Sequence, residues 1–259
     1  MSRLMVGCSG FPVAQARYWQ GLQAVEVQKT FYQPPRPDTL RRWRGGAPPG
    51  AAFALKAWQL VTHPPASPTY RRLSHPVPED RRDRYGWFRP TGEVWEAWER
   101  TRAAAVVLGA RAVLFQCPAS FRPTSENVQN LRRFFETIGP QPFWLAWEPR
   151  GAWPWELVAD LCRALGLVHA VDPFAADPVT ADPLYFRLHG RGGYRYRYSD
   201  GELRRLAAQV QGRTGFVFFN NSHMWDDAQR LLLLLNIRRT PPYNFGTSAF
   251  SRQSLVKNP

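Results

Sequence analysis

The sequence predicts a single (β/α)₈ TIM barrel. Eight short β-like runs are mostly separated by helical patterns, and this alternation predicts a parallel sheet with helices outside it. Eight such repeats close most naturally into a barrel. The length of 259 residues, 44% of them hydrophobic, suits one large domain with a sizeable core. A doubly wound open sheet is the alternative fold, but the chain lacks a GxGxxG turn after its first strand.

The predicted strands are short runs rich in aliphatic and aromatic residues. In chain order they are LMVGCS (4–9), AVEVQKT (24–30), AFALKA (52–57), AVLFQC (112–117), FWLAWE (143–148), VHAVD (168–172), LYFRLH (184–189) and GFVFFNN (215–221). Helical patterns lie at about 38–44, 93–109, 125–138, 153–165, 200–211 and 223–236. Ser125 and Asp200 are predicted to cap two of these helices, because each precedes an apolar stripe.

Two regions do not fit a minimal barrel. Residues 62–92 form a long loop after the third strand that is rich in proline and arginine. A loop of this length is usually a functional lid or partly disordered, and this position would put the loop over the active face. Residues 238–259 show little periodicity and are expected to pack loosely or to cross the barrel surface. We therefore predict a barrel domain over 1–237 and a C-terminal tail over 238–259.

Cysteine content and hydropathy suggest a cytoplasmic protein. The three cysteines show neither CxxC nor Cys/His ligand spacing, so the pattern indicates no disulfide framework and no zinc site. The apolar run at the N-terminus is too short for a signal peptide, and the longest aliphatic run, Leu231 to Leu235, is far below membrane-spanning length. We expect no membrane association, and no cofactor is indicated.

The net charge of +14 comes mainly from arginine, which supplies 31 of the 34 basic residues. A basic surface attracts nucleic acid, anionic substrates or acidic proteins. Because the arginines occur in scattered pairs, a solvated surface is favoured. Tyrosine and arginine alternate over residues 194–198, and aromatic and basic residues also mix near Trp87 and Phe88. Such segments resemble a stacking surface for bases or sugars, which leaves a nucleic-acid-binding or nucleic-acid-processing protein as an alternative.

Polar residues follow one phase of the predicted strands. Alternate residues of a barrel strand face the interior, and those near the carboxyl ends form the floor of the active site. The polar phase contains Ser9, Glu26, Gln28, Thr30, Lys56, Gln116, Glu148, Asp172, Arg187, His189 and Asn220, with Arg150 just beyond the fifth strand. The opposite phase is mostly apolar. Burying so many charges without a ligand would be costly, so these residues predict a ligand-binding mouth.

Six motifs resemble those of the YecE-like family, also called domain of unknown function 72. They are VEVQKTFYQPP, FALKAWQLVTHP, LFQCPASF, LAWEPRGAW, LYFRLHGRGGYRYRY and FVFFNNSHMWDDA, and the resemblance extends from about Gly7 to Leu235. It implies a TIM-barrel fold. The family has no established activity, so the resemblance implies no reaction. Phe11 stands where the family typically has tryptophan, and WEPRGAW replaces the commoner Glu-Phe-Arg-His form, which suggests a divergent branch.

These residues favour an enzyme that uses general acid/base chemistry on an anionic or phosphorylated polar substrate. Glu148 is the predicted general base, and His189 the proton donor or second base. Lys56 could have a lowered pKa and serve as a base or Schiff-base amine, but pairing with Glu26 or Glu148 is favoured, and Lys56 is expected to act as an electrostatic stabiliser. The residues predicted to bind or orient the substrate are Asp172, Gln116, Asn220, Arg150, Arg187, Glu26, Gln28 and Arg191.

A divalent-metal-dependent isomerase or hydrolase is a further alternative. Glu26, Glu148, Asp172 and His189 have side chains suited to a metal on a barrel mouth. Lys56, Arg150 and Arg187 would compete for the same carboxylates, so we predict no tightly bound metal. Phosphate or sulfate is expected instead near Arg187 and the GRGG turn, where barrels often bind phosphate.

Overall fold

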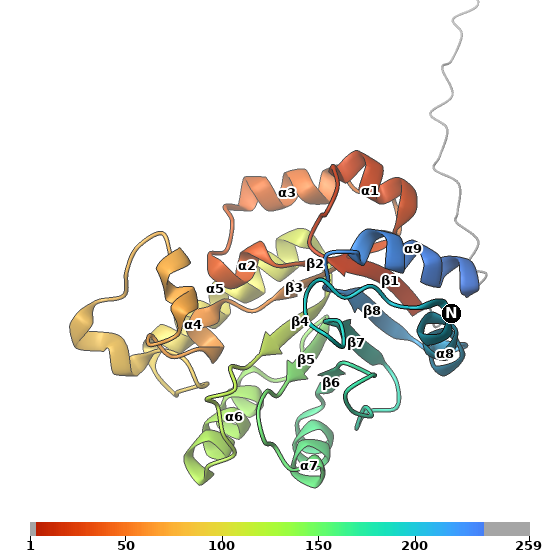
Figure 1. Ribbon diagram of the computed structural model, residues 1–259. Coiled ribbons are helices and arrows are strands. Elements are labelled where there is room, and N and C mark those ends of the chain that lie inside the picture. Colours follow the sequence, from red (N-terminus) through yellow and green to blue (C-terminus); the bar gives the residue numbers. More distant parts are fainter. Residues whose placement is uncertain (1–3, 236–259) are drawn as a thin grey trace, which may run out of the picture.

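A computed structural model describes residues 4–235, and its strands form a closed parallel barrel in the order β1 to β8 (Figure 1). The strands are β1 (Leu4–Ser9), β2 (Ala24–Val27), β3 (Ala52–Lys56), β4 (Ala110–Gln116), β5 (Trp144–Glu148), β6 (Val168–Val171), β7 (Leu184–Leu188) and β8 (Gly215–Phe219). The barrel closes where β8 pairs with β1, with Gly215 beside Leu4. The predicted TIM barrel is therefore confirmed, and the open sheet is wrong.

Helices surround the barrel, although one connection differs from the expected alternation. They are α1 (Gln15–Gly21), α2 (Lys29–Tyr32), α3 (Pro37–Gly45), α4 (Gln59–Thr62), α5 (Gly92–Leu108), α6 (Ser125–Ile138), α7 (Trp155–Leu165), α8 (Asp200–Val210) and α9 (Met224–Leu234). Sequence periodicity did not indicate α1, α2 and α4, since segments of four to seven residues are too short for an apolar stripe. Residues 172–183, between β6 and β7, contain no helix.

The two predicted helix caps lie one residue earlier than expected. Thr124 caps α6 by accepting a hydrogen bond from the Asn127 N–H. Ser199 caps α8 in a capping box with Glu202, in which each side chain accepts a bond from the other residue's N–H. Ser125 and Asp200 are instead the first helical residues. A hydroxyl acceptor satisfies amides that the first turn leaves unpaired, and the preceding Thr or Ser supplies it.

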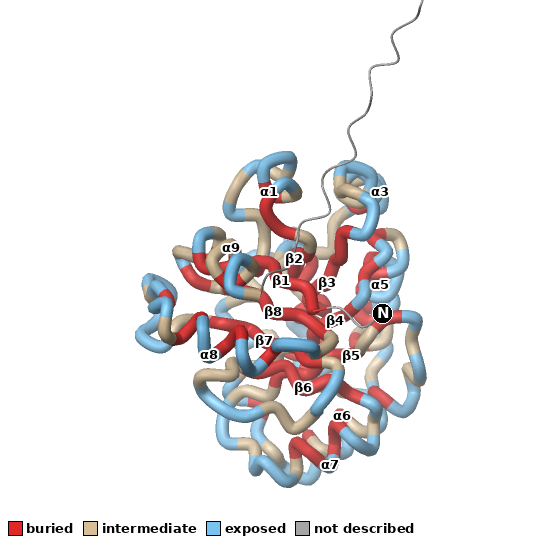
Figure 2. The backbone as a smooth tube through the Cα atoms, turned by 90° about the vertical axis from the view of Figure 1, so that its right-hand side faces the viewer, coloured by how far each residue is buried: buried red, intermediate tan, exposed pale blue. Residues whose placement is uncertain are grey.

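The core has two layers, which follow the two phases of the strands. The layer inside the barrel consists of Met5, Ala24, Ala52, Ala54, Ala112, Leu114, Ala146, Val168, Ala170, Tyr185, Phe216 and Phe218. The other layer packs the opposite phase, including Phe53 and Phe115, against the helices. Figure 2 shows the buried strands at the centre and exposed segments around them. The polar residues of the predicted mouth continue the inward phase, as Arg187 does two positions after Tyr185.

The segment 62–92 packs beside α4 and α5 and projects at the left of Figure 1. It includes the 3₁₀ turns η1 (Pro68–Arg72) and η2 (Glu79–Arg84). Its return is anchored to α4, because the Gly86 N–H donates to the Leu60 carbonyl at 2.8 Å. The tail over 238–259 lies outside the described residues. Between residues 4 and 235, every helix is too short or too polar to cross a membrane.

Candidate active site at the carboxyl ends of the strands

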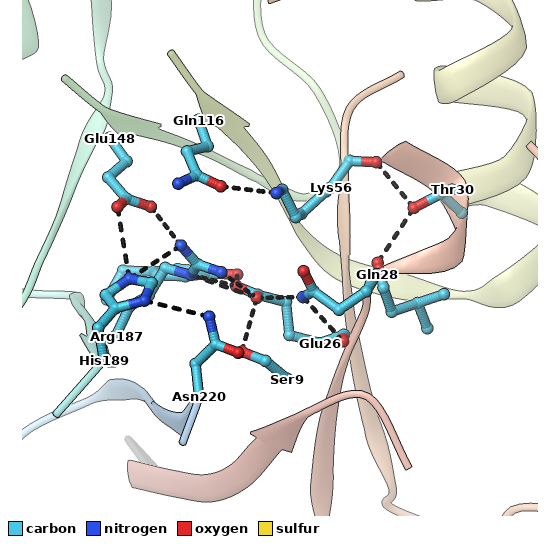
Figure 3. Close-up of polar contacts among 12 residues, drawn as sticks. Ser9, Glu26, Gln28, Thr30, Lys56, Gln116, Glu148, Arg187, His189 and Asn220 are labelled. Carbon is cyan, nitrogen blue, oxygen red and sulfur yellow. Dashed lines mark hydrogen bonds and ion pairs between the residues drawn. The ribbon is translucent and has the colours of Figure 1, made fainter. Parts of the chain in front are cut away.

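Arg187, next to the last residue of β7, joins two buried carboxylates (Figure 3). Its guanidinium Nη2 donates to Glu26 Oε1 at 2.8 Å, and its Nη1 donates to Glu148 Oε2 at 2.5 Å. Glu26 is fully buried and also accepts hydrogen bonds from Ser9, Gln28 and Tyr185. This network links β1, β2, β5 and β7 beneath the mouth of the barrel.

His189 lies above this network and faces several hydrogen-bond donors. Its Nε2 is 3.1 Å from Arg150 Nη2 and 3.3 Å from Arg187 Nη1, and it lies 3.6 Å from Glu148 Oε1. The Asn220 amide lies 3.1 Å from Nδ1. Two guanidinium groups therefore face Nε2 and an amide nitrogen faces Nδ1, so both ring nitrogens have polar neighbours. His189 therefore sits in a fixed orientation at the mouth.

The arginines keep both carboxylates ionised. Burial alone would raise the pKa of Glu148, but the charge of Arg187, the nearby His189 side chain and the charge of Arg150 hold that pKa well below its usual range. Burial opposes ionisation of Glu26 as well, yet the charge and hydrogen bonds of Arg187 hold its pKa below the ordinary value. A carboxylate stabilised in this way binds a proton weakly, so neither group is suited to accept one near neutral pH.

Lys56, the last residue of β3, pairs with an amide and not with a carboxylate in the part of the chain that the structure describes. Its Nζ donates to Gln116 Oε1 at 2.6 Å and lies 4.0 Å from the centre of the Phe31 ring. Among residues 4–235, Lys56 forms no ion pair with Glu26 or Glu148, so the expected pairing was wrong. Burial, together with the charge of Arg187, lowers the pKa of Lys56 to about 7. Its amine therefore changes protonation near neutral pH.

Two further residues of the mouth were not among the predicted site residues. Tyr185 donates its hydroxyl to Glu26 Oε2 at 2.7 Å, and its place in the same phase as Arg187 could have indicated this. The His63 ring packs edge-on against Phe31, with centroids 4.9 Å apart. Burial, then the charges of Lys56 and Arg150, lowers the pKa of His63 to about 3, so its ring is neutral. His63 lies in the proline-rich loop, where sequence patterns give no spatial signal.

Asp172 and Arg191 lie apart from the charged network. The Asp172 carboxylate accepts hydrogen bonds from the backbone N–H groups of Phe174 and His189, both at 3.0 Å, and thereby ties the 172–183 segment to β7. Arg191 is about half exposed and pairs with Glu202 at 3.3 Å. Arg187 and Arg191 thus do not converge on one place, and the GRGG turn does not add its arginine to the mouth.

A cavity of about 520 Å³ opens beside the network, between α7 and the 172–183 segment. Its polar lining includes Glu148, Arg150, His169, Asp172 and His189, and its apolar lining includes Trp153, Trp155, Val158, Val171 and Val179. The volume falls within the range of about 300–1,000 Å³ that small-molecule sites occupy. Arg187 is 1% exposed and does not line the cavity, so a small molecule there would contact Arg150 and His189 instead.

The geometry bears on both alternative functions. In residues 4–235, His, Cys, Asp and Glu side chains form no group of three or more that could hold a metal ion. Of the rings in the predicted stacking surface, Tyr198 and Phe88 are about 1% exposed, whereas Tyr194 is 60% exposed. Tyr196 donates its hydroxyl to Glu202 at 2.6 Å. Tyr198 and Phe88 thus belong to the core, and Tyr194 is the exposed ring of the 194–198 segment.

A closed β/α barrel with a charged network and a cavity at the carboxyl ends of its strands defines a TIM-barrel protein with a candidate active site. A family model described as "Protein of unknown function DUF72" matches residues 15–249. The chain therefore belongs to the DUF72 family, in agreement with the resemblance of its motifs to YecE-like proteins. No curated protein matches the chain.

Solved structures of two DUF72 proteins are similar to the chain. The one from Enterococcus faecalis is 18% identical, with 92% of this chain and 99% of that chain covered and a TM-score of 0.69. The one from Thermotoga maritima is 23% identical, with 90% and 99% covered and a TM-score of 0.65. An AP endonuclease of family 2 from Brucella melitensis is 13% identical, with 92% and 100% covered and a TM-score of 0.56.

A D-psicose 3-epimerase is 11% identical, with 91% and 99% covered and a TM-score of 0.53. At these identities the likeness concerns the fold alone. The chain thus shares its architecture with sugar epimerases and AP endonucleases, and the activity of the DUF72 family is not established.

Proposed function

We propose that this protein is an enzyme that transfers protons by general acid/base chemistry on an anionic, polar substrate at the barrel mouth. The observation that carries the proposal is Lys56, a buried amine with a pKa of about 7 beside a fixed network of ionised groups. Perturbed pKa values gather at functional sites, and TIM-barrel active sites lie at the carboxyl ends of the strands. The fold's likeness to an epimerase and an endonuclease agrees with an enzyme.

Lys56 replaces Glu148 as the proposed proton-transfer group. A general base works best when its pKa lies near the working pH, and Lys56 meets this condition. Glu148 accepts hydrogen bonds from Arg150 and Arg187, which stabilise its ionised form. We assign Glu148 to holding these two arginines in place. Gln116, which accepts the hydrogen bond from Lys56 Nζ, orients the amine.

Arg150 is the group proposed to bind the anionic part of the substrate. Its side chain is 39% exposed and lines the cavity. Nε and Nη2 of Arg150 face Glu148, whereas Nη1 has no hydrogen-bond partner among residues 4–235. The two N–H groups on Nη1 are therefore free for a phosphate or carboxylate oxygen. His189, Asp172 and Asn220 are proposed to orient the substrate around this contact.

The test is proton exchange with solvent. The protein is incubated in D₂O with a panel of sugar phosphates, keto acids and nucleotides, and loss of C–H signals is followed by proton NMR. We expect exchange with at least one compound, and Lys56→Met should lower its rate by about 10²–10⁴-fold, the usual contribution of a general base. Replacing the exposed Arg195 with Gln is the control and should leave the rate unchanged. No exchange with any compound, or exchange that survives Lys56→Met, would contradict the proposal.

A further inference from the structure

One side of the cavity is formed by the irregular segment that connects β6 and β7 in place of a helix. Residues 172–183 cross this position as an irregular segment, whereas α7 covers the neighbouring connection. Trp155 and Val158 of α7 line one side of the cavity, and Val179 lines the other. We call this part of the cavity the recess. It opens toward the charged network, because Glu148, Arg150 and His189 line the same cavity.

His169 presents a fixed hydrogen-bond donor to the recess. The Val179 N–H donates to His169 Nδ1 at 3.2 Å, so Nδ1 is an acceptor and Nε2 carries the proton. Burial lowers the pKa of His169 to about 4, which keeps the ring neutral. The residue is 7% exposed and lines the cavity, and its Nε2 has no partner in the described part of the chain. Because the ring lines the cavity, this donor is available to a ligand there.

The remaining lining combines a flat apolar wall with both kinds of polar group. Trp155 is 55% exposed, which is unusual for an indole on a helix that packs against a barrel. Asp172 and Asp177 supply acceptors, while Arg150 and His169 supply donors. Hydroxyl groups both donate and accept hydrogen bonds, and the C–H faces of a sugar ring pack against an aromatic ring. A purely aromatic ligand would leave most of these polar groups unpaired.

We propose that the recess binds a sugar bearing an anionic group, with its ring against Trp155, an oxygen accepting from His169 Nε2 and the anionic group at Arg150. This inference rests on the proposed function, since it names the substrate class of the same mouth. Trp155 and His169 are specificity-determining residues in this arrangement. Neither residue contacts Lys56, so their replacement separates binding from proton transfer.

Calorimetric titration with glucose 6-phosphate, phenyl phosphate and inorganic phosphate tests the proposal. The sugar phosphate should bind at least about tenfold more tightly than the other two, the size expected when several buried hydrogen bonds distinguish ligands. Trp155→Ala and His169→Phe should each weaken its binding toward that of phosphate, and His169→Gln should restore part of it through the amide donor. Tyr194→Ala, at a residue 60% exposed and outside the cavity lining, is the matched control.

Phenyl phosphate binding as tightly as glucose 6-phosphate would overturn the sugar assignment. Equal binding of all three ligands, or binding unchanged by Trp155→Ala, would also overturn it. Since Trp155 is exposed, its variant folds even if the His169 variants do not. Tight sugar phosphate binding without any proton exchange would uphold the recess and refute the proposed function. Proton exchange on keto acids or nucleotides, with no preference for sugar phosphate in the titrations, would uphold the proposed function and refute the sugar assignment.

Discussion

Replacing Glu26 with Gln should destabilise the protein strongly, because Glu26 is the fully buried partner of Arg187. The substitution keeps the shape but removes the charge, and it turns an acceptor oxygen into an NH₂ group facing donors from Ser9, Tyr185 and Arg187. Breaking a buried ion pair from one side costs about 3–5 kcal/mol. For a chain of this size, each kcal/mol lowers the melting temperature by about 2–4 °C, so a fall of about 6–20 °C is expected.

Urea unfolding followed by tryptophan fluorescence measures this loss. The folded-state pKa of Glu26 lies below its ordinary value of 4.5, so its stabilising contribution is present above that pH. The contribution is lost as pH falls from there toward the folded-state pKa, and the difference between the two proteins should shrink in that window. The control is Glu99→Gln, which breaks an exposed pair with Arg102 and should cost less than about 0.5 kcal/mol. A loss below about 1 kcal/mol for Glu26→Gln would refute the reasoning.

Two further variants test individual contacts. Burial lowers the pKa of Lys56 from 10.5 to about 7, so the unfolded chain binds more protons than the folded chain between these pH values. The stability of the natural protein relative to Lys56→Met should therefore rise with pH across this window, by up to about 5 kcal/mol. Urea unfolding at several pH values measures this rise, and a constant difference would contradict it. Asp172→Ala removes the acceptor of the Phe174 and His189 N–H groups and should cost about 1–3 kcal/mol. Amide hydrogen exchange should then accelerate in residues 172–183, and unchanged exchange there would show that the carboxylate does not hold the segment.

The sequence predicted the barrel well because both signals that define it are local. Each strand is a short apolar run, and the phase that carries polar residues is visible within a single strand, as at Tyr185, Arg187 and His189. Closure into a barrel follows from the number of repeats. Glu26, Glu148 and Arg187 therefore came together as the phase argument predicted.

The alternation of polar and apolar residues could not predict which side chains of different strands contact each other. Alternation fixes the face of each side chain but not its distance from a side chain on another strand. Lys56 accordingly bonds to Gln116 instead of a carboxylate, and Arg191 pairs with Glu202. The recess depends on a helix that is missing between β6 and β7, and His169 lies in the phase opposite to the predicted mouth. Neither feature has a periodic signal.

The protonation of Lys56 tests the proposed active site most directly. The chain has only three lysines, Lys29, Lys56 and Lys257, so lysine labelled with ¹³C at Cε gives few NMR signals, and the one absent from Lys56→Met is assigned at once. Its chemical shift is followed as a function of pH. We predict a midpoint at about 7, whereas an ordinary lysine titrates at about 10.4. A midpoint at or above about 10 would contradict the assignment of Lys56 as the proton-transfer group.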